Sequence, residues 1–347
     1  MKIWRACCFT VTASLLSSCI AIADELEDAE EVETYQSAQA MFKPLHPAAP
    51  TAEFPLTAAS ISLGRALFFD KRISASGSVS CAVCHQPENY GTDTLPRSID
   101  QVNNIQTRNA QSILNASQNF ANNWYGDQAN VEAQALATLT SPAGLGHKSD
   151  DAAMEKIKAQ PEYQELFAQA FPHSRDPITP QNWASAVGAY ERTLLTPSPF
   201  DAYLQGNRQA LNPVAKAGLG RFINLGCIAC HNGIAVGAAS YQKFGIWADY
   251  WLHTKSSHID KGRFNITNDD NDLYVFRVAS LRNVTKTAPY FHDGSVKTLP
   301  EAVRIMGKIQ LKKTLSEDDV KLIVAFLNTL TGKLPPSFSP PPATGAP

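Results

Sequence analysis

The chain has 347 residues, which is long enough for two domains that each enclose a core. Its formal net charge is −2, so the composition gives no reason to expect a nucleic acid as a partner. Hydrophobic residues make up 44% of the sequence and charged residues 18%, values that are ordinary for a globular protein. The 22 prolines and 19 glycines indicate a large share of loop.

Residues 1–23 are predicted to be a signal peptide that is not part of the fold. Two basic residues near the start precede an apolar stretch, and residues 21–23 (Ala-Ile-Ala) have the A-x-A pattern of a cleavage site. Residues 16–19 also resemble a lipobox, whose Cys19 would be lipidated after cleavage; simple secretion is favoured, because a lone lipid motif is unspecific. In both cases we expect a periplasmic protein, and no later apolar run is long enough to span a bilayer.

Residues 24–55 are acidic at first and then rich in proline and alanine, a composition that predicts a flexible lead-in. The folded part begins near residue 56, and its apolar residues recur at helical spacing in a series of segments. Helices are expected over residues 60–70, 131–139, 152–171, 183–195, 212–225, 299–306 and 316–330. Pro161 should divide the third of these into two shorter helices. The Pro-rich tail over residues 334–347 has no core pattern.

A C-x-x-C-H run occurs twice, once in each half of the chain. In this pattern the two thiols can add across the vinyl groups of a haem, while the adjacent histidine binds the iron. Two such runs in one exported chain are a strong signal for two covalently bound c-type haems. The residues are Cys81, Cys84 and His85 in the first run, and Cys227, Cys230 and His231 in the second.

The same cysteines admit three other interpretations: a redox dithiol, a zinc site and disulfides. A redox C-x-x-C would lie in a βαβ unit, yet no strand-rich pattern surrounds either run. A compact zinc site would need a second half-site close by, and neither a zinc site nor a dithiol requires a histidine directly after the second cysteine. The remaining cysteines, Cys7, Cys8 and Cys19, fall within the signal peptide, so none is left for a structural disulfide. The haem interpretation is therefore favoured.

These patterns predict a mostly α protein with two cytochrome-c-like domains, residues 56–200 and residues 201–333, each with one covalently bound haem. A c-type haem with six iron ligands needs a second axial residue, usually Met or His. Met306, after the second run, is the best candidate of only four methionines, and a thioether ligand would raise the potential of that haem. The alternative is an ordinary core methionine on an amphipathic helix.

Between about residue 56 and residue 332 the chain resembles the bacterial di-haem cytochrome c peroxidases. The resemblance rests on many separated motifs that occur in the same order, so it is specific. Besides both C-x-x-C-H runs, the matching stretches are residues 63–70 (LGRALFFD), 74–77 (SASG), 191–197 (ERTLLTP), 261–264 (KGRF), 276–278 (FRV), 280–283 (SLRN), 287–292 (TAPYFH), 301–303 (EAV) and 305–307 (IMG).

The resemblance implies a division of labour between the two haems. The C-terminal haem, with Met306 opposite His231, would receive electrons from a small cytochrome c or cupredoxin. The N-terminal haem would be the low-potential peroxide site. Trp124 matches a tryptophan that lies between the haems in the family, and its alternative role is that of a packing aromatic.

The resemblance also implies a calcium ion between the domains, bound partly by backbone carbonyls at positions that match Asn109, Thr287 and Pro289. Oxygen ligands of this kind suit calcium. Without the resemblance, an isolated Asn or Thr would be interpreted as a turn residue. A homodimer is a further expectation from the family, and nothing in the composition decides it.

The peroxide site departs from the family pattern. The distal histidine of the family falls on Gln101 and its pocket glutamate on Gly144, whereas its pocket glutamine is matched by Gln134. Cleavage of the O–O bond needs a group that moves a proton, which an imidazole or a carboxylate can do and an amide cannot; such a group is worth about 10²–10⁴-fold in rate. His147 is the nearest candidate to replace it, although an exposed loop histidine is the plainer interpretation.

The sequence thus predicts a di-haem peroxidase of low efficiency that reduces H₂O₂ to water with electrons from a small periplasmic redox protein. The alternatives on the same scaffold are a di-haem electron-transfer or redox-maturation protein and a haem-based sensor with weak peroxidase activity. Related enzymes that oxidise a partner protein resemble this chain less, since they have a tyrosine at the position of Met306 and retain the pocket acid.

Overall fold

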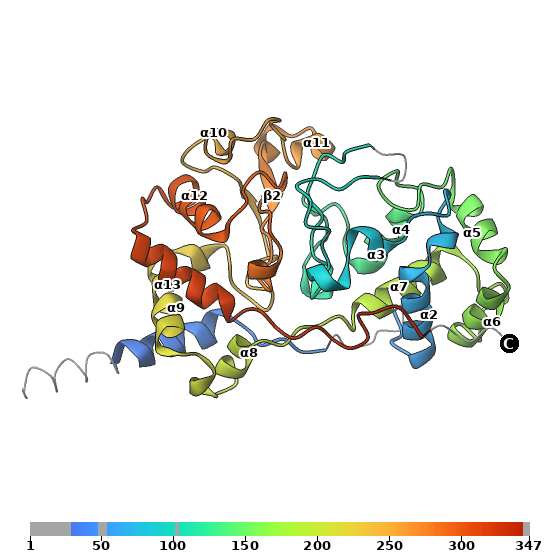
Figure 1. The fold of residues 1–347 in the computed structure, drawn as a ribbon, viewed down its shortest axis with the longest axis horizontal. Helices are drawn as coiled ribbons and strands as arrows, with labels where there is room; N and C mark the ends of the chain where they lie inside the picture. Colours follow the sequence, from blue (N-terminus) through green and yellow to red (C-terminus); the bar gives the residue numbers. More distant parts are fainter. Residues whose placement is uncertain (1–28, 48–53, 101–103, 343–347) are drawn as a thin grey trace, which may run out of the picture.

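The computed structural model describes residues 29–47, 54–100 and 104–342. Within these ranges the chain forms an N-terminal and a C-terminal unit, both mainly helical and lying side by side (Figure 1). The helices of the N-terminal unit are α2 (Ala58–Phe69), α3 (Cys81–Cys84), α4 (Val131–Thr138), α5 (Asp150–Lys158), α6 (Pro161–Ala170) and α7 (Pro180–Glu191). Those of the C-terminal unit are α8 (Pro199–Leu204), α9 (Pro213–Leu225), α10 (Tyr250–Thr254), α11 (Phe264–Thr267), α12 (Leu299–Leu311) and α13 (Glu317–Asn328). Two short strands, β1 (Tyr241–Lys243) and β2 (Val275–Arg277), pair antiparallel.

The helices expected from apolar periodicity are present in the structure, with ends that differ by a few residues. Pro161 separates α5 from α6 as predicted, because α6 begins on the proline, where the missing N–H has no helical partner to lose. The helices α8, α10 and α11 and the strand pair were not among the predicted elements. Among the residues that the structure describes, no helix is both long and apolar enough to cross a membrane.

Both units contain a pair of helices that cross at a glycine. A Cβ atom added to Gly64 on α2 would lie 1.8 Å from the carbonyl oxygen of Ala186 on α7. In the second unit, a Cβ atom on Gly218 of α9 would lie 2.0 Å from the carbonyl oxygen of Leu322 on α13. Only glycine permits two backbones to approach this closely. The repeated crossing is what a duplicated unit would produce.

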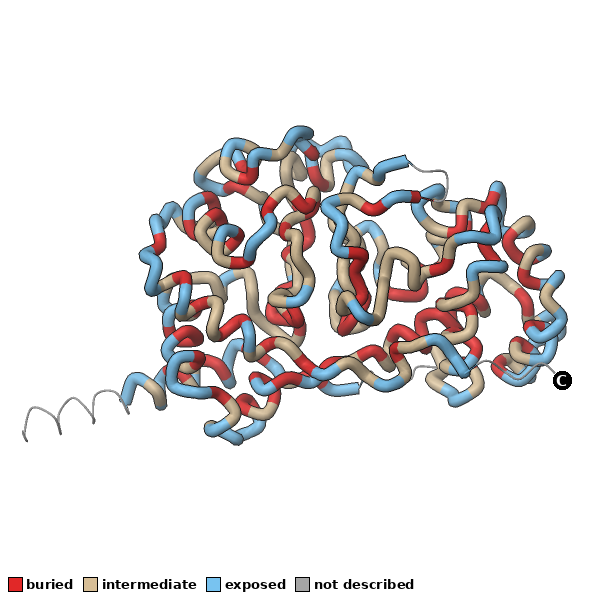
Figure 2. The backbone as a smooth tube through the Cα atoms, viewed as in Figure 1, coloured by how far each residue is buried: buried red, intermediate tan, exposed pale blue. Residues whose placement is uncertain are grey.

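Each unit encloses its own apolar core, and buried residues gather inside both (Figure 2). Large members of the N-terminal core are Leu63, Leu67, Tyr163, Phe167 and Trp183. Large members of the C-terminal core are Phe200, Tyr203, Phe222, Tyr250 and Phe326. The two cores give each C-x-x-C-H run a rigid framework of helices.

The predicted flexible lead-in is wrong where the structure describes it. Residues 29–41 are helical and lie against the C-terminal unit, whose core buries Ala38 and Phe42. The ring of Phe42 meets that of Phe200 edge-on, with centroids 5.2 Å apart. Composition missed this helix because its partners are far away in the sequence. Residues 1–28, which include the predicted signal peptide and lipobox, lie outside the described residues.

The Pro-rich tail also packs, although the sequence showed no core pattern there. It runs back from the C-terminal unit to the N-terminal unit (Figure 1), where Phe338 is buried with its ring centroid 6.3 Å from that of Phe68. The hydroxyl of Tyr190 donates to the carbonyl of Ser337 at 3.0 Å. Arg65 Nε donates to the carbonyl of Ser339 at 2.8 Å. The tail therefore fastens the two units together.

Candidate active site

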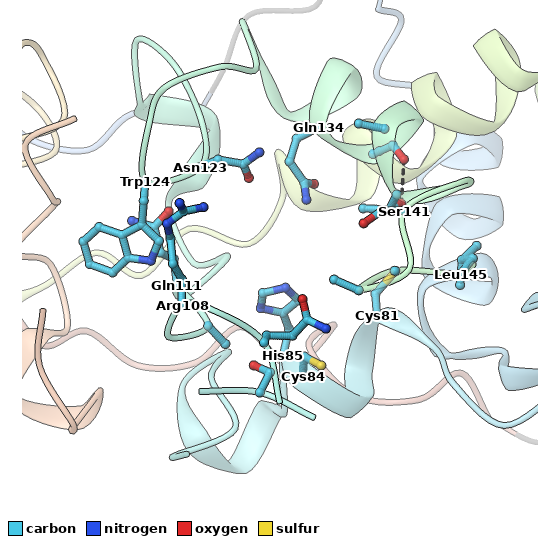
Figure 3. Close-up of a pocket in the computed structure, with 18 of the residues that line it drawn as sticks. Cys81, Cys84, His85, Arg108, Gln111, Asn123, Trp124, Gln134, Ser141 and Leu145 are labelled. Atoms are coloured by element: carbon cyan, nitrogen blue, oxygen red, sulfur yellow. Dashed lines mark hydrogen bonds between the residues drawn. The ribbon is translucent and has the colours of Figure 1, made fainter. Parts of the chain in front are cut away.

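The first C-x-x-C-H run lies on the wall of a cavity of about 490 Å³ in the N-terminal unit (Figure 3). Cys81 and Cys84 are the ends of α3, and the N–H of His85 donates to the carbonyl of Cys81 at 2.9 Å. This single turn brings both thiols and the imidazole to one cavity. The carbonyl of Gly91 lies 3.0 Å from His85 Nδ1, which leaves Nε2 free to bind a metal. Burial lowers the pKa of His85 and so favours the neutral ring that a ligand requires.

Gln134 points into this cavity from α4 (Figure 3). The side-chain amide of Gln134 has no hydrogen-bond partner among the described residues, so it is free to bind a molecule in the cavity. Asn123 lines the same cavity, and its Nδ2 donates to Asp127 at 3.3 Å. Gln101, the residue at the expected position of a distal histidine, lies outside the described residues.

Gly144 lines the cavity in a loop that leaves no room for a side chain. A Cβ atom here would lie 2.4 Å from the carbonyl oxygen of Thr138. The loop is fixed by two hydrogen bonds, from the N–H of Gly144 to the carbonyl of Ser141 at 2.9 Å and from the N–H of Leu145 to the carbonyl of Thr138 at 2.8 Å. A glutamate at this position would require the backbone to move.

His147 is neither a cavity residue nor an exposed loop residue, so both predictions for it are wrong. It is buried, and its Nε2 lies 2.8 Å from the carbonyl oxygen of Ile73. Its backbone N–H donates to the carbonyl of Leu139 at 3.0 Å. His147 does not line the cavity, and it serves instead to join its own loop to the turn after α2. The sequence signal failed because chain proximity to Gly144 does not fix the direction of a side chain.

Two acidic residues line the cavity, Asp127 and Glu191. Neither was predicted from the sequence to be a site residue. Asp127 is exposed, whereas Glu191 at the end of α7 is only 4% exposed. In the described part of the chain the side-chain carboxyl of Glu191 has no hydrogen bond or ion pair, and the adjacent Arg192 pairs with Glu132 at 2.6 Å. Burial and then the Glu132 carboxylate raise the pKa of Glu191 to about 8, against a smaller opposing effect of Arg192. A neutral acid therefore borders the cavity at neutral pH.

The second C-x-x-C-H run lies on a cavity of about 400 Å³ in the C-terminal unit. Gly226, with a left-handed φ of 97°, ends α9 and turns the chain into Cys227. The N–H of His231 donates to the carbonyl of Cys227 at 3.0 Å, and burial lowers the pKa of His231 to about 4. Met306 on α12 lines the same cavity, together with Cys230. The structure thus brings thiols, imidazole and thioether to one cavity, and ligation by Met306 stays a prediction.

The two cavities share a wall. Its residues are Asn109, Ala110, Gln111 and Trp124, each of which lines both cavities. The indole Nε1 of Trp124 donates to the carbonyl of Asn109 at 2.9 Å, which fixes the ring in this wall. Trp124 is therefore in the expected place, between the two C-x-x-C-H sites, and its part in electron transfer stays a prediction.

The residues predicted to bind calcium, Asn109, Thr287 and Pro289, all line the second cavity. Asn109 donates through Nδ2 to the carbonyl of Leu95 at 2.8 Å, and its Oδ1 has no hydrogen-bond partner among the described residues. No cluster of three or more His, Cys, Asp or Glu side chains suited to a metal occurs in the described ranges. Asn109, Thr287 and Pro289 offer amide and carbonyl oxygens, the type of ligand that calcium binds, and calcium binding by them stays a prediction.

Comparison with known proteins identifies the family. A profile described as di-haem cytochrome c peroxidase matches residues 58–209. The cytochrome c551 peroxidase of Pseudomonas aeruginosa is 41% identical over 318 residues, which cover 91% of this chain and 89% of that protein. This chain belongs to the di-haem cytochrome c peroxidase family. The prediction of an oxidoreductase of the peroxidase class is thereby confirmed.

Other proteins that are similar to this chain carry different names. The methylamine utilization protein MauG of Methylorubrum extorquens is 34% identical, over 80% of this chain and 79% of that protein. A solved MauG-like protein associated with microbial copper homeostasis has a TM-score of 0.77 and 29% identity, over 86% of this chain and 97% of that chain. The family is di-haem, and each cavity offers what a covalent haem c requires: two thiols one turn apart and a neutral imidazole.

Proposed function

We propose that this peroxidase reduces hydrogen peroxide to water at the first cavity, with electrons that a small periplasmic redox protein delivers at the second. The observation that carries the proposal is the shared wall, where two cavities with a C-x-x-C-H run each meet at Trp124. The relative in Pseudomonas aeruginosa supports it, since that protein is named as a peroxidase of cytochrome c551.

In the first cavity, Cys81 and Cys84 would hold a haem through thioether bonds, and His85 would bind its iron through Nε2. When bound there, haem supplies an iron that accepts peroxide and passes electrons to it. The free amide of Gln134 would orient the peroxide. The reaction H₂O₂ + 2e⁻ + 2H⁺ → 2H₂O needs protons, and Glu191 is a cavity acid that burial keeps protonated up to about pH 8.

In the second cavity, Cys227 and Cys230 would hold the other haem, and His231 and Met306 would bind its iron. A thioether ligand raises the reduction potential of a haem, which suits a centre that accepts electrons from outside. Trp124, in the wall between the cavities, would then lie on the path of electrons to the first site.

The electron donor would dock where exposed apolar side chains border the second cavity. Ile246 lines that cavity and is 47% exposed, and Trp247 beside it is 58% exposed. The Nζ of Lys312 lies 5.0 Å from the centre of the Trp247 ring. An apolar face edged by a lysine fits a redox protein with an apolar contact surface and acidic groups around it.

A calcium ion would join the two units at the shared wall. Asn109 comes from the N-terminal unit, whereas Thr287 and Pro289 come from the C-terminal unit, and all three line one cavity. Binding through Asn109 Oδ1 and the two backbone carbonyls would hold the units in fixed relation. Removal of calcium with a chelator should therefore slow the transfer of electrons between the haems. The haems themselves should stay bound, because they are covalently attached.

Steady-state oxidation of a reduced c-type cytochrome by H₂O₂ tests the proposed function. We expect turnover by the purified two-haem protein and only background turnover by His85→Ala. His173→Ala is the matched control, because His173 is exposed and does not line either cavity. Equal background rates for the wild type and His85→Ala would overturn the proposal.

A second candidate function is redox maturation of, or electron transfer to, another protein. It is favoured by the loop at Gly144, which has no room for a proton-transferring side chain. It is also favoured by the 34% identity to a protein named for methylamine utilization. A protein of this kind, or a haem-based sensor, would show ligand-dependent spectra but slow peroxide turnover with any small donor.

A further inference from the structure

Arg277 is a buried cation that has no counter-ion among the residues the structure describes. It ends β2 on the wall of the second cavity and is only 3% exposed. No carboxylate lies within ion-pair distance of it in the described part of the chain. The other arginine buried to this degree, Arg282, is 4% exposed and binds Asp201 through two nitrogens, each at 2.9 Å. The contrast shows that this fold pairs a buried guanidinium where it can.

Within the described ranges, the hydrogen bonds of the Arg277 side chain go only to backbone carbonyls. Its Nε donates to the carbonyl of Asn123 at 3.0 Å, and Nη1 donates to the carbonyl of Val278 at 3.2 Å. Nη2 has no partner in the described residues. Burial lowers the pKa of Arg277 to about 10, so the side chain stays charged at neutral pH.

A charge in this position needs an anion. Desolvation of an unpaired ion costs several kcal/mol, and a backbone carbonyl offsets only part of that cost. The described residues supply no acid here, but Arg277 borders a cavity of about 400 Å³. A planar guanidinium with free N–H groups matches a carboxylate, which it can bind through two parallel hydrogen bonds.

We propose that Arg277 binds a propionate carboxylate of the haem attached at Cys227 and Cys230. The inference rests on the proposed function in one respect, that this cavity holds the second haem. Arg277 also contacts the wall between the two cavities, because its backbone N–H donates to the carbonyl of Trp124 at 2.9 Å. Arg277 thus connects a charged group of the second haem to the wall that separates the two sites.

The test compares Arg277→Gln and Arg277→Lys with Arg221→Gln. Arg221 is the matched control, because it is an exposed arginine of the same unit with an ion pair to Asp319 at 3.1 Å. Each holoprotein is measured for covalent haem per chain and for the reduction potential of each haem, as a function of pH, in a spectroelectrochemical titration. Neither readout needs peroxide or a donor.

We expect Arg277→Gln to lower the reduction potential of the haem attached at Cys227 and Cys230. The reduced-to-oxidised ratio of that haem at a fixed applied potential should fall by roughly tenfold. The pH dependence of that potential should move to higher pH, because loss of the cation raises the pKa of the propionate. Arg277→Lys should lie between the wild type and Arg277→Gln, and Arg221→Gln should match the wild type.

An unchanged potential and pH dependence in a two-haem Arg277→Gln protein would overturn the proposal. If Arg277→Gln fails to mature, retention of haem by Arg277→Lys would support a charge contact. Loss of haem from both variants, with Arg221→Gln intact, would instead show that Arg277 only braces the backbone. A wild-type protein with two haems but no peroxide turnover would count against the proposed function and leave the Arg277 test in force.

Discussion

Replacement of Glu191 by glutamine should change how the stability of the protein depends on pH. Glu191 lies at the end of α7 on the wall of the first cavity, almost fully buried. Burial raises its pKa from 4.5 to about 8, and the nearby Glu132 carboxylate adds to this effect. The neighbouring Arg192 compensates little, because it is held at 2.6 Å by Glu132. Glutamine keeps the shape of the side chain and removes its titration.

The size of the effect follows from proton linkage. Between pH 4.5 and pH 8 the folded protein keeps the Glu191 proton, which the unfolded chain has lost. The folded state therefore binds more protons, and the free energy of unfolding falls as pH rises through this window. The rise in pKa from 4.5 to about 8 lowers the free energy of unfolding by about 5 kcal/mol across this window, at about 1.4 kcal/mol per pKa unit. This value is an upper limit for a single buried group. Glu191→Gln should lose this slope and gain stability over the wild type towards pH 8.

Urea unfolding followed by circular dichroism at pH 5, 6.5 and 8 measures this slope. The control is Glu155→Gln, since Glu155 is exposed on α5. We expect the difference in unfolding free energy between Glu191→Gln and the wild type to grow by several kcal/mol from pH 5 to pH 8. A constant difference over that range would refute the claim that Glu191 is protonated in the folded protein.

Three further predictions concern the walls of the cavities. Met306→Ala should lower the potential of the high-potential haem, as seen in a redox titration; an unchanged potential would show that Met306 is not its ligand. Gly144→Ala should destabilise the protein by about 1–3 kcal/mol in urea unfolding, because the new Cβ would lie 2.4 Å from the Thr138 carbonyl, and no change would mean that the loop moves freely. Trp124→Phe removes the hydrogen bond to Asn109 and should slow the peroxide-driven reoxidation of the C-terminal haem in stopped-flow mixing; an unaltered rate would exclude the indole from the path.

The features that sequence analysis predicted correctly are those that depend on neighbours in the chain. Pro161 divides two helices because its own ring and missing N–H determine the break. The thiols of Cys81 and Cys84 reach one cavity with His85 because a single helical turn fixes their spacing. Such local rules also located the long helices of both units.

The features that it missed depend on contacts between distant segments. Glu191 belongs to the first cavity only because α7 crosses α2, and no local pattern marks it as a cavity acid. His147 is three residues beyond Gly144, yet it turns away to bond the carbonyl of Ile73. The tail residue Phe338 packs on the opposite unit. Periodicity and spacing hold no information on such contacts.

The central claim is that the two cavities work as one two-electron site. It is tested most directly by titration of the fully reduced, two-haem protein with H₂O₂ under anaerobic conditions, followed by absorbance at both haems. One peroxide takes two electrons, so we predict that one equivalent per chain oxidises both haems. Oxidation of one haem alone, with the haem attached at Cys227 and Cys230 left reduced on the time scale of turnover, would contradict the account.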